Sequence, residues 1–158
     1  MLTVEVDDRV IMARLNAMPG KLRSALLKKT YELAEKLKSK VQQNLTNKIL
    51  QIRTGKLSRS IFEQVTNSTN EVSGRVYSSG VPYAAIQEFG GQTKAHIIEA
   101  RNGKALMFNM GGKQVFFKRI NHPGSNIPAH HYMGQAFDAM KPEIQSGYEQ
   151  AVKGATHE

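Results

Sequence analysis

Apolar residues recur every three, four or seven positions in two long segments of the chain. In the first segment they are Leu22, Leu26, Leu33, Leu37, Val41, Leu45 and Ile49, and in the second they are Met133, Phe137, Met140, Ile144, Tyr148 and Val152. This spacing places them along one face of a helix. We therefore expect a long helix from Lys21 to about Gln51 and another from His131 to Val152, which Pro142 should kink or restart.

Between the two helical segments, apolar and polar residues alternate with the period of strands. The expected strands are Ile61–Val65, Glu71–Ser78, Ala105–Met110 and Gln114–Ile120, with turns at Asn67–Asn70 and Gly111-Gly112. The pattern predicts an α+β fold, in which a small antiparallel sheet is flanked by a long N-terminal helix and a C-terminal helix. At 158 residues, the chain should form a single domain over residues 1–158.

Three segments lack the pattern of a packed element. Residues 1–20 are expected to form an N-terminal arm with a short helix from Arg9 to Ala17, and residues 153–158 a frayed tail. Residues 90–104 are polar and rich in turn residues, which predicts a mobile loop. Ile97 and Ile98 are the exception in that loop, and we interpret them as a short strand that adds to the sheet edge of a neighbouring subunit or docks in its groove.

Composition excludes several classes of protein. The absence of cysteine rules out disulfides, thiolate catalysis and cysteine-ligated metals. No apolar stretch approaches the roughly 20 residues needed to cross a bilayer, and the N-terminus lacks the features of a signal peptide. We therefore expect a soluble protein with no membrane contact.

The net charge of +9 indicates an acidic partner. Residues 1–80 hold 14 basic and 7 acidic residues, so most of the excess lies in the first half. Lys28, Lys29, Lys36 and Lys40 on the first helix are candidates for non-specific phosphate contacts with DNA, although lysines on a helix more often form a solvated face.

Candidate chemistry is sparse. His96, His122, His130 and His131 do not have the spacing of a metal site, and Gly55-Lys56 lacks the rest of a phosphate-binding loop. We expect neither a metal nor a cofactor. The acidic residues are isolated in the sequence and no nucleophile motif is present, so an enzyme is the least favoured class.

The stretch from Val81 to Gly91 combines a proline, aromatics, a carboxylate and paired glycines, and we expect the chain to be organised around it. Glu88 stands between Ile86 and Phe89, where a carboxylate needs a partner, and we predict an ion pair with Lys118, Arg119 or another subunit. The candidate residues for an assembly interface are Tyr83, Glu88, Phe89, Ile97 and Ile98.

A series of short motifs runs in order through most of the chain, from Lys21 to Val152. They are Thr54-Gly55-Lys56-Leu57-Ser58-Arg59-Ser60-Ile61, Pro82-Tyr83-Ala84, Glu88-Phe89-Gly90, Phe116-Phe117-Lys118 and His122-Pro123-Gly124. The series resembles the "gene product ten" family of tailed-phage proteins.

That resemblance implies a structural virion protein for tail completion or head-to-tail joining at the neck of a phage or prophage. It also implies partners among other neck and tail proteins, a homo-oligomeric ring, and assembly in the cytoplasm of the bacterial host. The alternative, based on charge alone, is a small basic nucleic-acid-binding accessory protein.

Overall fold

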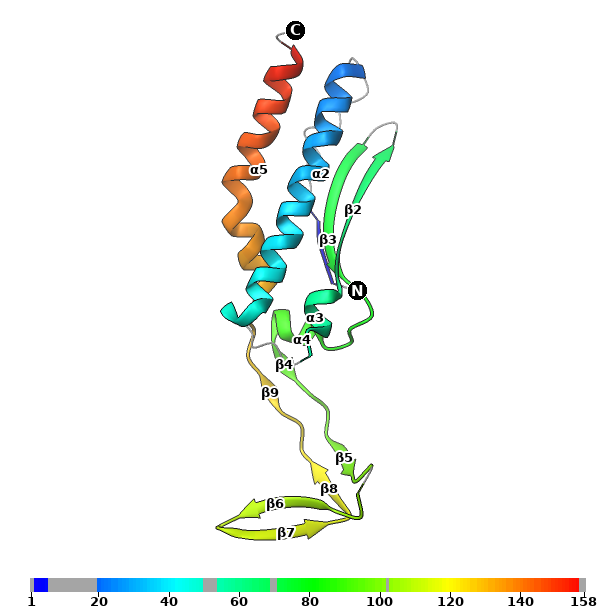
Figure 1. Cartoon of the computed structure of the whole chain (residues 1–158), viewed down its shortest axis with the longest axis vertical. Helices are drawn as coiled ribbons and strands as arrows, with labels where there is room; N and C mark the ends of the chain where they lie inside the picture. The colour runs from blue at the N-terminus through cyan, green and yellow to red at the C-terminus, as the bar shows by residue number, and fades with distance from the viewer. Residues whose placement is uncertain (1, 6–19, 50–53, 69–70, 102, 157–158) are drawn as a thin grey trace.

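The protein consists of a helical body and an arm that projects from one end of it (Figure 1). The computed structural model describes residues 2–5, 20–49, 54–68, 71–101 and 103–156. Two long helices, α2 (Gly20–Gln43) and α5 (Tyr132–Thr156), dominate the body, and a π-helical turn, η1 (Asn44–Lys48), continues α2. The chain combines these helices with small antiparallel sheets, so the predicted α+β fold class is confirmed.

The sheet of the body has three antiparallel strands. Strands β2 (Ile61–Ser68) and β3 (Glu71–Ser78) form the predicted hairpin, and β1 (Leu2–Glu5) pairs with the other edge of β3. The sequence analysis missed β1, because four residues at a chain end carry too little pattern. The helix expected at Arg9–Ala17 lies outside the described residues.

Helix α2 packs against both the sheet and α5. Its apolar stripe supplies most of one side of the core, as the spacing predicted. The main cluster of buried apolar residues comprises Leu37, Val41, Leu45, Ile61, Val76, Tyr132, Met133, Ala136 and Met140. A second cluster, formed by Leu22 and Leu26 with Tyr148, Ala151 and Ala155, joins the start of α2 to the end of α5.

Two predictions about α5 can be compared with the structure. The helix continues through Pro142 without restarting, although proline has no N–H to donate to the carbonyl one turn earlier, so of the two predicted effects of Pro142 only a kink stays a prediction. The same helix extends to Thr156, so the first residues of the segment expected to fray are helical. Packing of the flanking apolar residues against α2 holds the helix together on both sides of the proline.

Two short helices lie at the end of the body from which the arm projects, and the second of them leads into the arm (Figure 1). Helix α3 (Lys56–Arg59) follows Gly55, whose φ of +66° favours glycine, and α4 (Ala84–Phe89) ends at Gly90. Hydroxyl groups of Ser60 and Ser78 lie 2.8 Å apart where α3 meets the sheet.

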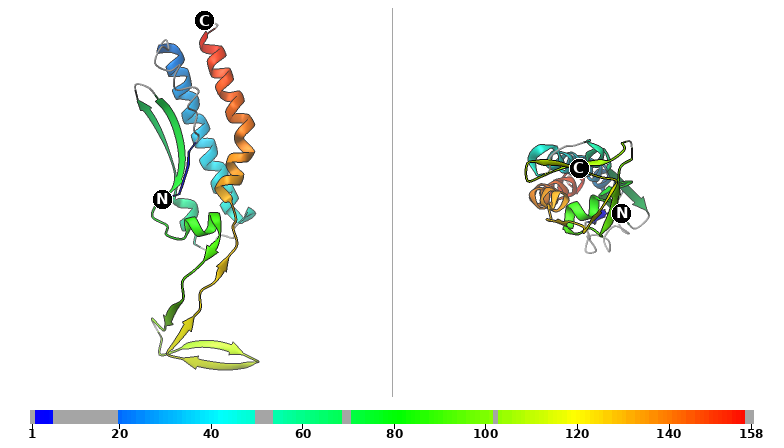
Figure 2. Two further views of the ribbon diagram at one scale, coloured as in Figure 1. Left: turned by 180° about the vertical axis from the view of Figure 1, so that it is seen from behind. Right: turned by 90° about the horizontal axis from the view of Figure 1, so that it is seen from below.

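The arm is a long, interrupted hairpin made of three successive strand pairs. From the body outwards they are β4 (Gly91–Gln92) with β9 (Asn126–Ile127), β5 (His96–Glu99) with β8 (Arg119–His122), and β6 (Leu106–Met110) with β7 (Lys113–Phe117). Figure 2 shows that the inner part of the arm extends along the long axis of the helices, whereas the β6–β7 pair at its end turns across that axis. The predicted strands of the second half are therefore present, but they do not join the sheet of the body.

Residues 90–104, predicted to be a mobile loop, form the outgoing limb of this arm. The polar, glycine-containing composition predicts a loop, because the sequence near this segment offers no second strand with which it could pair. In the structure its backbone pairs with the returning limb 20 to 36 residues later in the chain, as the registers Glu99↔Arg119 and Gly91↔Ile127 show for its two ends.

Candidate functional site

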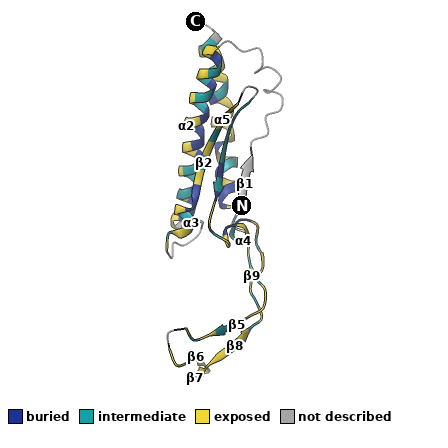
Figure 3. Cartoon of the chain, turned by 90° about the vertical axis from the view of Figure 1, so that its right-hand side faces the viewer, coloured by how far each residue is buried: buried dark blue, intermediate teal, exposed yellow. Residues whose placement is uncertain are grey.

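The residues of the arm are exposed or partly buried, whereas the buried residues lie in the body and beside α4 (Figure 3). Five of the large hydrophobic residues that are exposed in the described part of the chain lie on the arm: Ile97, Met107, Met110, Phe116 and Phe117. Met107 and Phe116 are 59% and 63% exposed. Such a concentration on a thin projecting element is typical of a surface that contacts another molecule.

The tip of the arm is a tight hairpin with apolar residues on both faces. Gly111 and Gly112 have φ angles of +57° and +79°, as a two-residue type I′ turn requires, and the predicted turn is confirmed. Met107 lies opposite Phe116 on one face. On the other face Leu106 lies opposite Phe117 and Phe108 opposite Val115, with the Phe108 and Phe117 rings 6.3 Å apart.

Close backbone approach holds the two limbs together nearer the body. Thr93 donates its backbone N–H to the carbonyl of Ser125 at 2.9 Å, and the N–H of Ser125 donates to the Thr93 hydroxyl at 2.7 Å. Gly124 has a φ of +94°, and a Cβ there would overlap the carbonyl oxygen of Thr93. Only glycine fits this position.

A buried carboxylate joins the arm to the body. Glu88, only 3% exposed, lies at the end of α4. Its two carboxylate oxygens accept hydrogen bonds from the backbone N–H groups of Met133 (2.8 Å) and Gly134 (2.9 Å) in the first turn of α5. Free N–H groups and the positive end of the helix dipole both stabilise an anion there. Glu88 therefore caps α5, and the predicted ion pair with Lys118 or Arg119 is wrong.

Main-chain hydrogen bonds reinforce this connection. The N–H groups of His130 and His131 donate to the carbonyls of Gln87 and Glu88, both at 3.0 Å. The outgoing limb thus leaves the body at the point where the returning limb enters it. We call the residues from Ala84 to Glu88 and from His130 to Gly134, with Asn44, the junction.

Tyr132 anchors the junction in the core. It is fully buried, its carbonyl accepts a hydrogen bond from the Asn44 amide at 2.9 Å, and its hydroxyl donates to the carbonyl of Ala84 at 3.4 Å. Burial raises the pKa of the Tyr132 hydroxyl, and the nearby charge of Glu88 raises that pKa further. The side chain is therefore held in its neutral form.

Comparison with protein families matches residues 9–90 to the family described as "Bacteriophage HK97-gp10, putative tail-component". The match spans just over half of the chain. The chain belongs to this family. Comparison with curated proteins and comparison with solved structures find no match.

Family membership confirms the resemblance drawn from the sequence motifs and identifies the chain as a phage tail-related protein, and thus as part of a virion. The region matched to the tail-component family ends at Gly90, where the arm begins. It includes helix α2, strands β2 and β3 of the body's sheet, and the part of the junction that contains Glu88, whereas β1 lies before it. The arm and helix α5 lie outside the matched region.

The residues predicted as an assembly interface fall in two places on this tail-component protein. Tyr83 and Phe89, at the two ends of α4, are 41% and 64% exposed. Ile97 is exposed on the arm, whereas Ile98 is partly buried and pairs with Ile120 in the same chain. Glu88 is buried within the monomer, so its carboxylate is not available to another subunit. The interface role of the other four residues stays a prediction.

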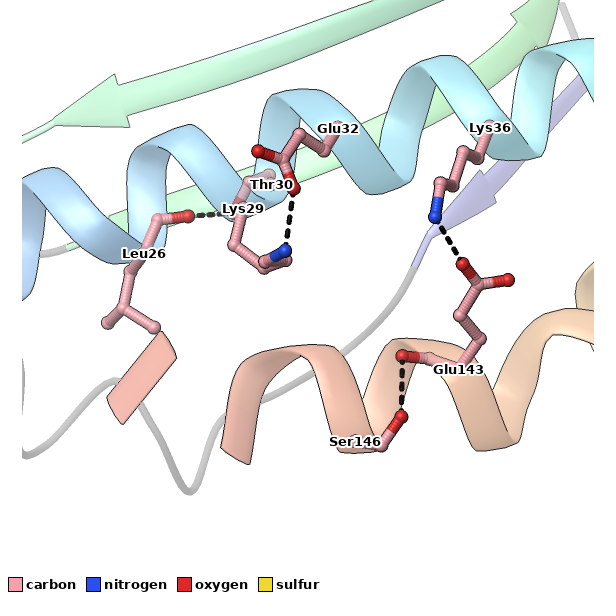
Figure 4. A network of polar contacts seen from close by, with 7 residues as sticks. All are labelled: Leu26, Lys29, Thr30, Glu32, Lys36, Glu143 and Ser146. Carbon is pink, nitrogen blue, oxygen red and sulfur yellow. Dashed lines mark hydrogen bonds and ion pairs between the residues drawn. The ribbon is translucent and has the colours of Figure 1, made fainter. Parts of the chain in front are cut away.

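The lysines predicted to contact phosphate are partly neutralised within the body (Figure 4). Lys29 pairs with Glu32 at 2.6 Å, and Lys36 pairs with Glu143 of α5 at 2.5 Å. The hydrogen bond from Lys29 lowers the pKa of Glu32, and the one to Glu143 raises the pKa of Lys36. Within the described residues, Lys28 and Lys40 make no ion pair. The four lysines thus do not act as one free basic surface.

The arm carries a concentration of charge that the sequence analysis missed. Residues 91–127 contain six basic residues and one acidic residue, Glu99, which gives a net charge of +5. The basic residues are Lys94, Arg101, Lys104, Lys113, Lys118 and Arg119. Division of the chain into two halves at residue 80 concealed this excess, because the rest of the second half, Glu88 and residues 128–158, holds five acidic residues and only two basic ones.

The four histidines of the described residues are separated into two pairs. The rings of His96 and His122 stack across β5 and β8 with their centroids 5.0 Å apart, whereas His130 and His131 belong to the junction. Among the residues the structure describes, no group of three or more histidine, aspartate or glutamate side chains could hold a metal ion. No helix in that part of the chain is long and apolar enough to cross a membrane.

Proposed function

We propose that this protein completes the phage tail and joins it to the head at the neck, as a structural component and not as an enzyme. Copies of the chain would form a closed ring around the DNA conduit, assembled in the host cytoplasm together with other neck and tail proteins. The proposal goes further than the tail-component family, which supplies only the general role.

The observation that carries this proposal is the combination of a packed body with a projecting arm. The body packs α2, the sheet and α5 around one core. The junction attaches the arm to this body through the Glu88 carboxylate and two backbone hydrogen bonds, from His130 to Gln87 and from His131 to Glu88. A protein that links two large assemblies needs one part that is held in place and one part that reaches a second component. The body and the arm meet these two needs.

Deletion of the gene tests the proposed role. In the deletion strain we expect DNA-filled heads and separate tails that fail to join, seen by electron microscopy, with the infectious yield restored when the gene is supplied on a plasmid. A normal infectious yield without the gene would contradict the proposal. An accumulation of empty heads would also contradict it, because it would indicate an earlier step.

The proposed ring has its own test. A closed ring requires a contact in which one surface of each copy binds a different surface of the next. Light scattering of the purified protein, alone and with neck partners, should reveal a defined oligomer. A strict monomer under both conditions would argue against the ring while leaving the joining role open.

A further inference from the structure

We propose that the arm inserts its β6–β7 tip into an apolar groove with an acidic rim on another protein of the phage tail. This inference rests on the proposed function, since it names the contact by which the protein would engage its neighbour in the tail. Neither the tail-component match, which ends at Gly90, nor the motif resemblance assigns a role to the arm's tip.

The first observation is that both faces of the tip carry apolar side chains. Met107 and Phe116 share one face with Asn109 and Gln114, and the other face carries Leu106, Phe108, Val115 and Phe117 with Met110 and Lys113. An isolated two-stranded hairpin is at best marginally stable in water and gains stability when its apolar faces are covered. A hairpin that lies on a flat surface buries one face only. Apolar residues on both faces indicate a groove that covers the tip from both sides.

The second observation is that the positive charges of the arm are not compensated within the chain. All six basic residues of the arm are exposed, and within the part of the chain that the structure describes none of them makes an ion pair. By contrast, Lys29, Lys36, Lys38 and Lys141 of the body each pair with a carboxylate. Complementary charge on the partner would steer the arm and fix its orientation.

These features together favour a protein of different sequence over a second copy or a nucleic acid. The rest of the chain, without residues 91–127, still has a net charge of +4, since nine minus five leaves four, so the body of a second copy would repel the arm. The DNA backbone would attract the charges but offers no apolar surface to Met107, Phe116 or Phe117. An acidic protein groove accommodates both the charge and the apolar side chains.

Variants of each face of the tip test the groove directly. The probe is tails purified from a strain that lacks the gene, and binding of the purified protein is measured by co-sedimentation. We expect Met107→Thr/Phe116→Thr and Val115→Thr/Phe117→Thr each to raise the Kd roughly tenfold or more. Threonine keeps a high strand propensity, so the hairpin is retained. Tyr31→Thr, which changes an exposed aromatic residue of α2, should leave the Kd unchanged.

The charge of the arm is tested separately by salt. Lys113→Glu/Lys118→Glu should raise the Kd strongly in dilute buffer and much less in about 0.5 M salt, where the Debye length is only a few ångströms. Lys21→Glu/Lys28→Glu reverses the same amount of exposed charge on the body and should have little effect in either buffer. The variants of the apolar faces should remain defective in both buffers.

The outcomes separate this inference from the proposed function. The groove would be supported if the variants of both faces lose binding to tails while the body variants keep it. The groove is wrong if the variant of one face alone raises the Kd, or if the arm variants bind tails as well as the unchanged protein does. Either result counts against the groove even when the unchanged protein restores head-to-tail joining. If binding depends on the arm but joining does not need the protein, the proposed function is wrong and the groove stands.

Alternative partners have their own readouts. Arm-dependent binding to a 30-base-pair duplex, to vesicles of anionic lipid, or between copies of the protein, without binding to tails, would overturn the inference. Circular dichroism and the Tm of each variant must match those of the unchanged protein, so that loss of binding reports on the surface of the tip and not on the fold of the body.

Discussion

The carboxylate of Glu88 accepts a hydrogen bond from the backbone N–H of Met133 at 2.8 Å, although 45 residues separate them in the chain. Removal of this carboxylate leaves two N–H groups of α5 without their partner in a buried place. We expect Glu88→Ala to lower the free energy of unfolding by about 2 kcal/mol and Glu88→Gln by about 1 kcal/mol, since the amide keeps one acceptor oxygen but no charge.

Chemical denaturation followed by circular dichroism measures both values. Glu149→Ala, which changes an exposed carboxylate on the same helix, is the control and should fall within about 0.5 kcal/mol of the unchanged protein. If Glu88→Ala were equally mild, the junction would not depend on the cap.

Gly74 of β3 allows α2 to approach the sheet. A Cβ at this position would lie 2.9 Å from the Cγ2 methyl of Thr30, whose hydroxyl bonds to the carbonyl of Leu26 and to the hydroxyl of Tyr148. We expect Gly74→Ala to cost about 1–3 kcal/mol of stability. Thr30→Ser removes the methyl and keeps the hydroxyl, so the double variant should lose less than the sum of the two single variants. Strict additivity in denaturation experiments would show that the close approach is not the cause.

Glycines within α5 should respond differently to alanine. A Cβ at Gly147 would meet Lys29 and Leu33 at ordinary contact distances of 3.4 Å and beyond, and one at Gly154 would meet nothing. Both changes should stabilise the protein by about 0.5–1 kcal/mol through helix propensity. At Gly134 the Cβ would lie 3.3 Å from a carboxylate oxygen of Glu88, so the same change should give little or no gain in Tm. Destabilisation by Gly147→Ala would contradict the described packing of α2 on α5.

Stability at alkaline pH should depend on Tyr132. Burial raises the pKa of its hydroxyl in the folded protein above the ordinary value of 10.0, so the unfolded chain loses the proton first. The contribution of Tyr132 to the free energy of unfolding is therefore complete below about pH 10, and it is lost as the pH rises from there through the raised pKa of the folded protein. Tyr132→Phe should weaken this decline at little cost near neutral pH, because the bond to Ala84 is long. An equal alkaline decline in both proteins would exclude Tyr132 as its source.

Gly124 should be essential for the shape of the arm but not for the fold of the body. Alanine there would be strained at a φ of +94° and would overlap the Thr93 carbonyl. We expect Gly124→Ala to leave the Tm nearly unchanged, since the core lies elsewhere, and to speed tryptic cleavage within the arm at sites such as Arg101 and Lys118. The matched control is Gly112→Asn at the tip, because asparagine tolerates a positive φ, and it should leave both the Tm and the cleavage rate unchanged. A large fall in Tm would show that the arm contributes to the core.

The parts of the fold that follow from local sequence were predictable. The stripe of Leu33, Leu37 and Val41 specified α2, and Gly111-Gly112 between alternating residues specified the hairpin at the tip. The course of the arm was not predictable, because the outgoing limb has no pattern of its own and becomes a strand only through pairing with residues far along the chain.

The role of Glu88 was only half predictable. Its apolar neighbours indicated that the carboxylate needs a partner, but the sequence offers many cations and does not show that a helix N-terminus lies beside it. One signal was available. Helix α5 begins after His130-His131 with no serine, threonine, aspartate or asparagine to cap it, and a helix without a local cap needs an acceptor from elsewhere in the fold.

The junction also makes the arm an insertion whose length can vary. Because the chain leaves the body at Gly90 and returns beside it at Ala129, the body does not depend on how many residues lie between them. Each two residues added to both limbs would move the tip outward by about 7 Å and keep every side chain on its face. The number of residue pairs in the arm thus sets the distance from the body to the tip, and a change in that number would alter the reach of the arm without any change to the core.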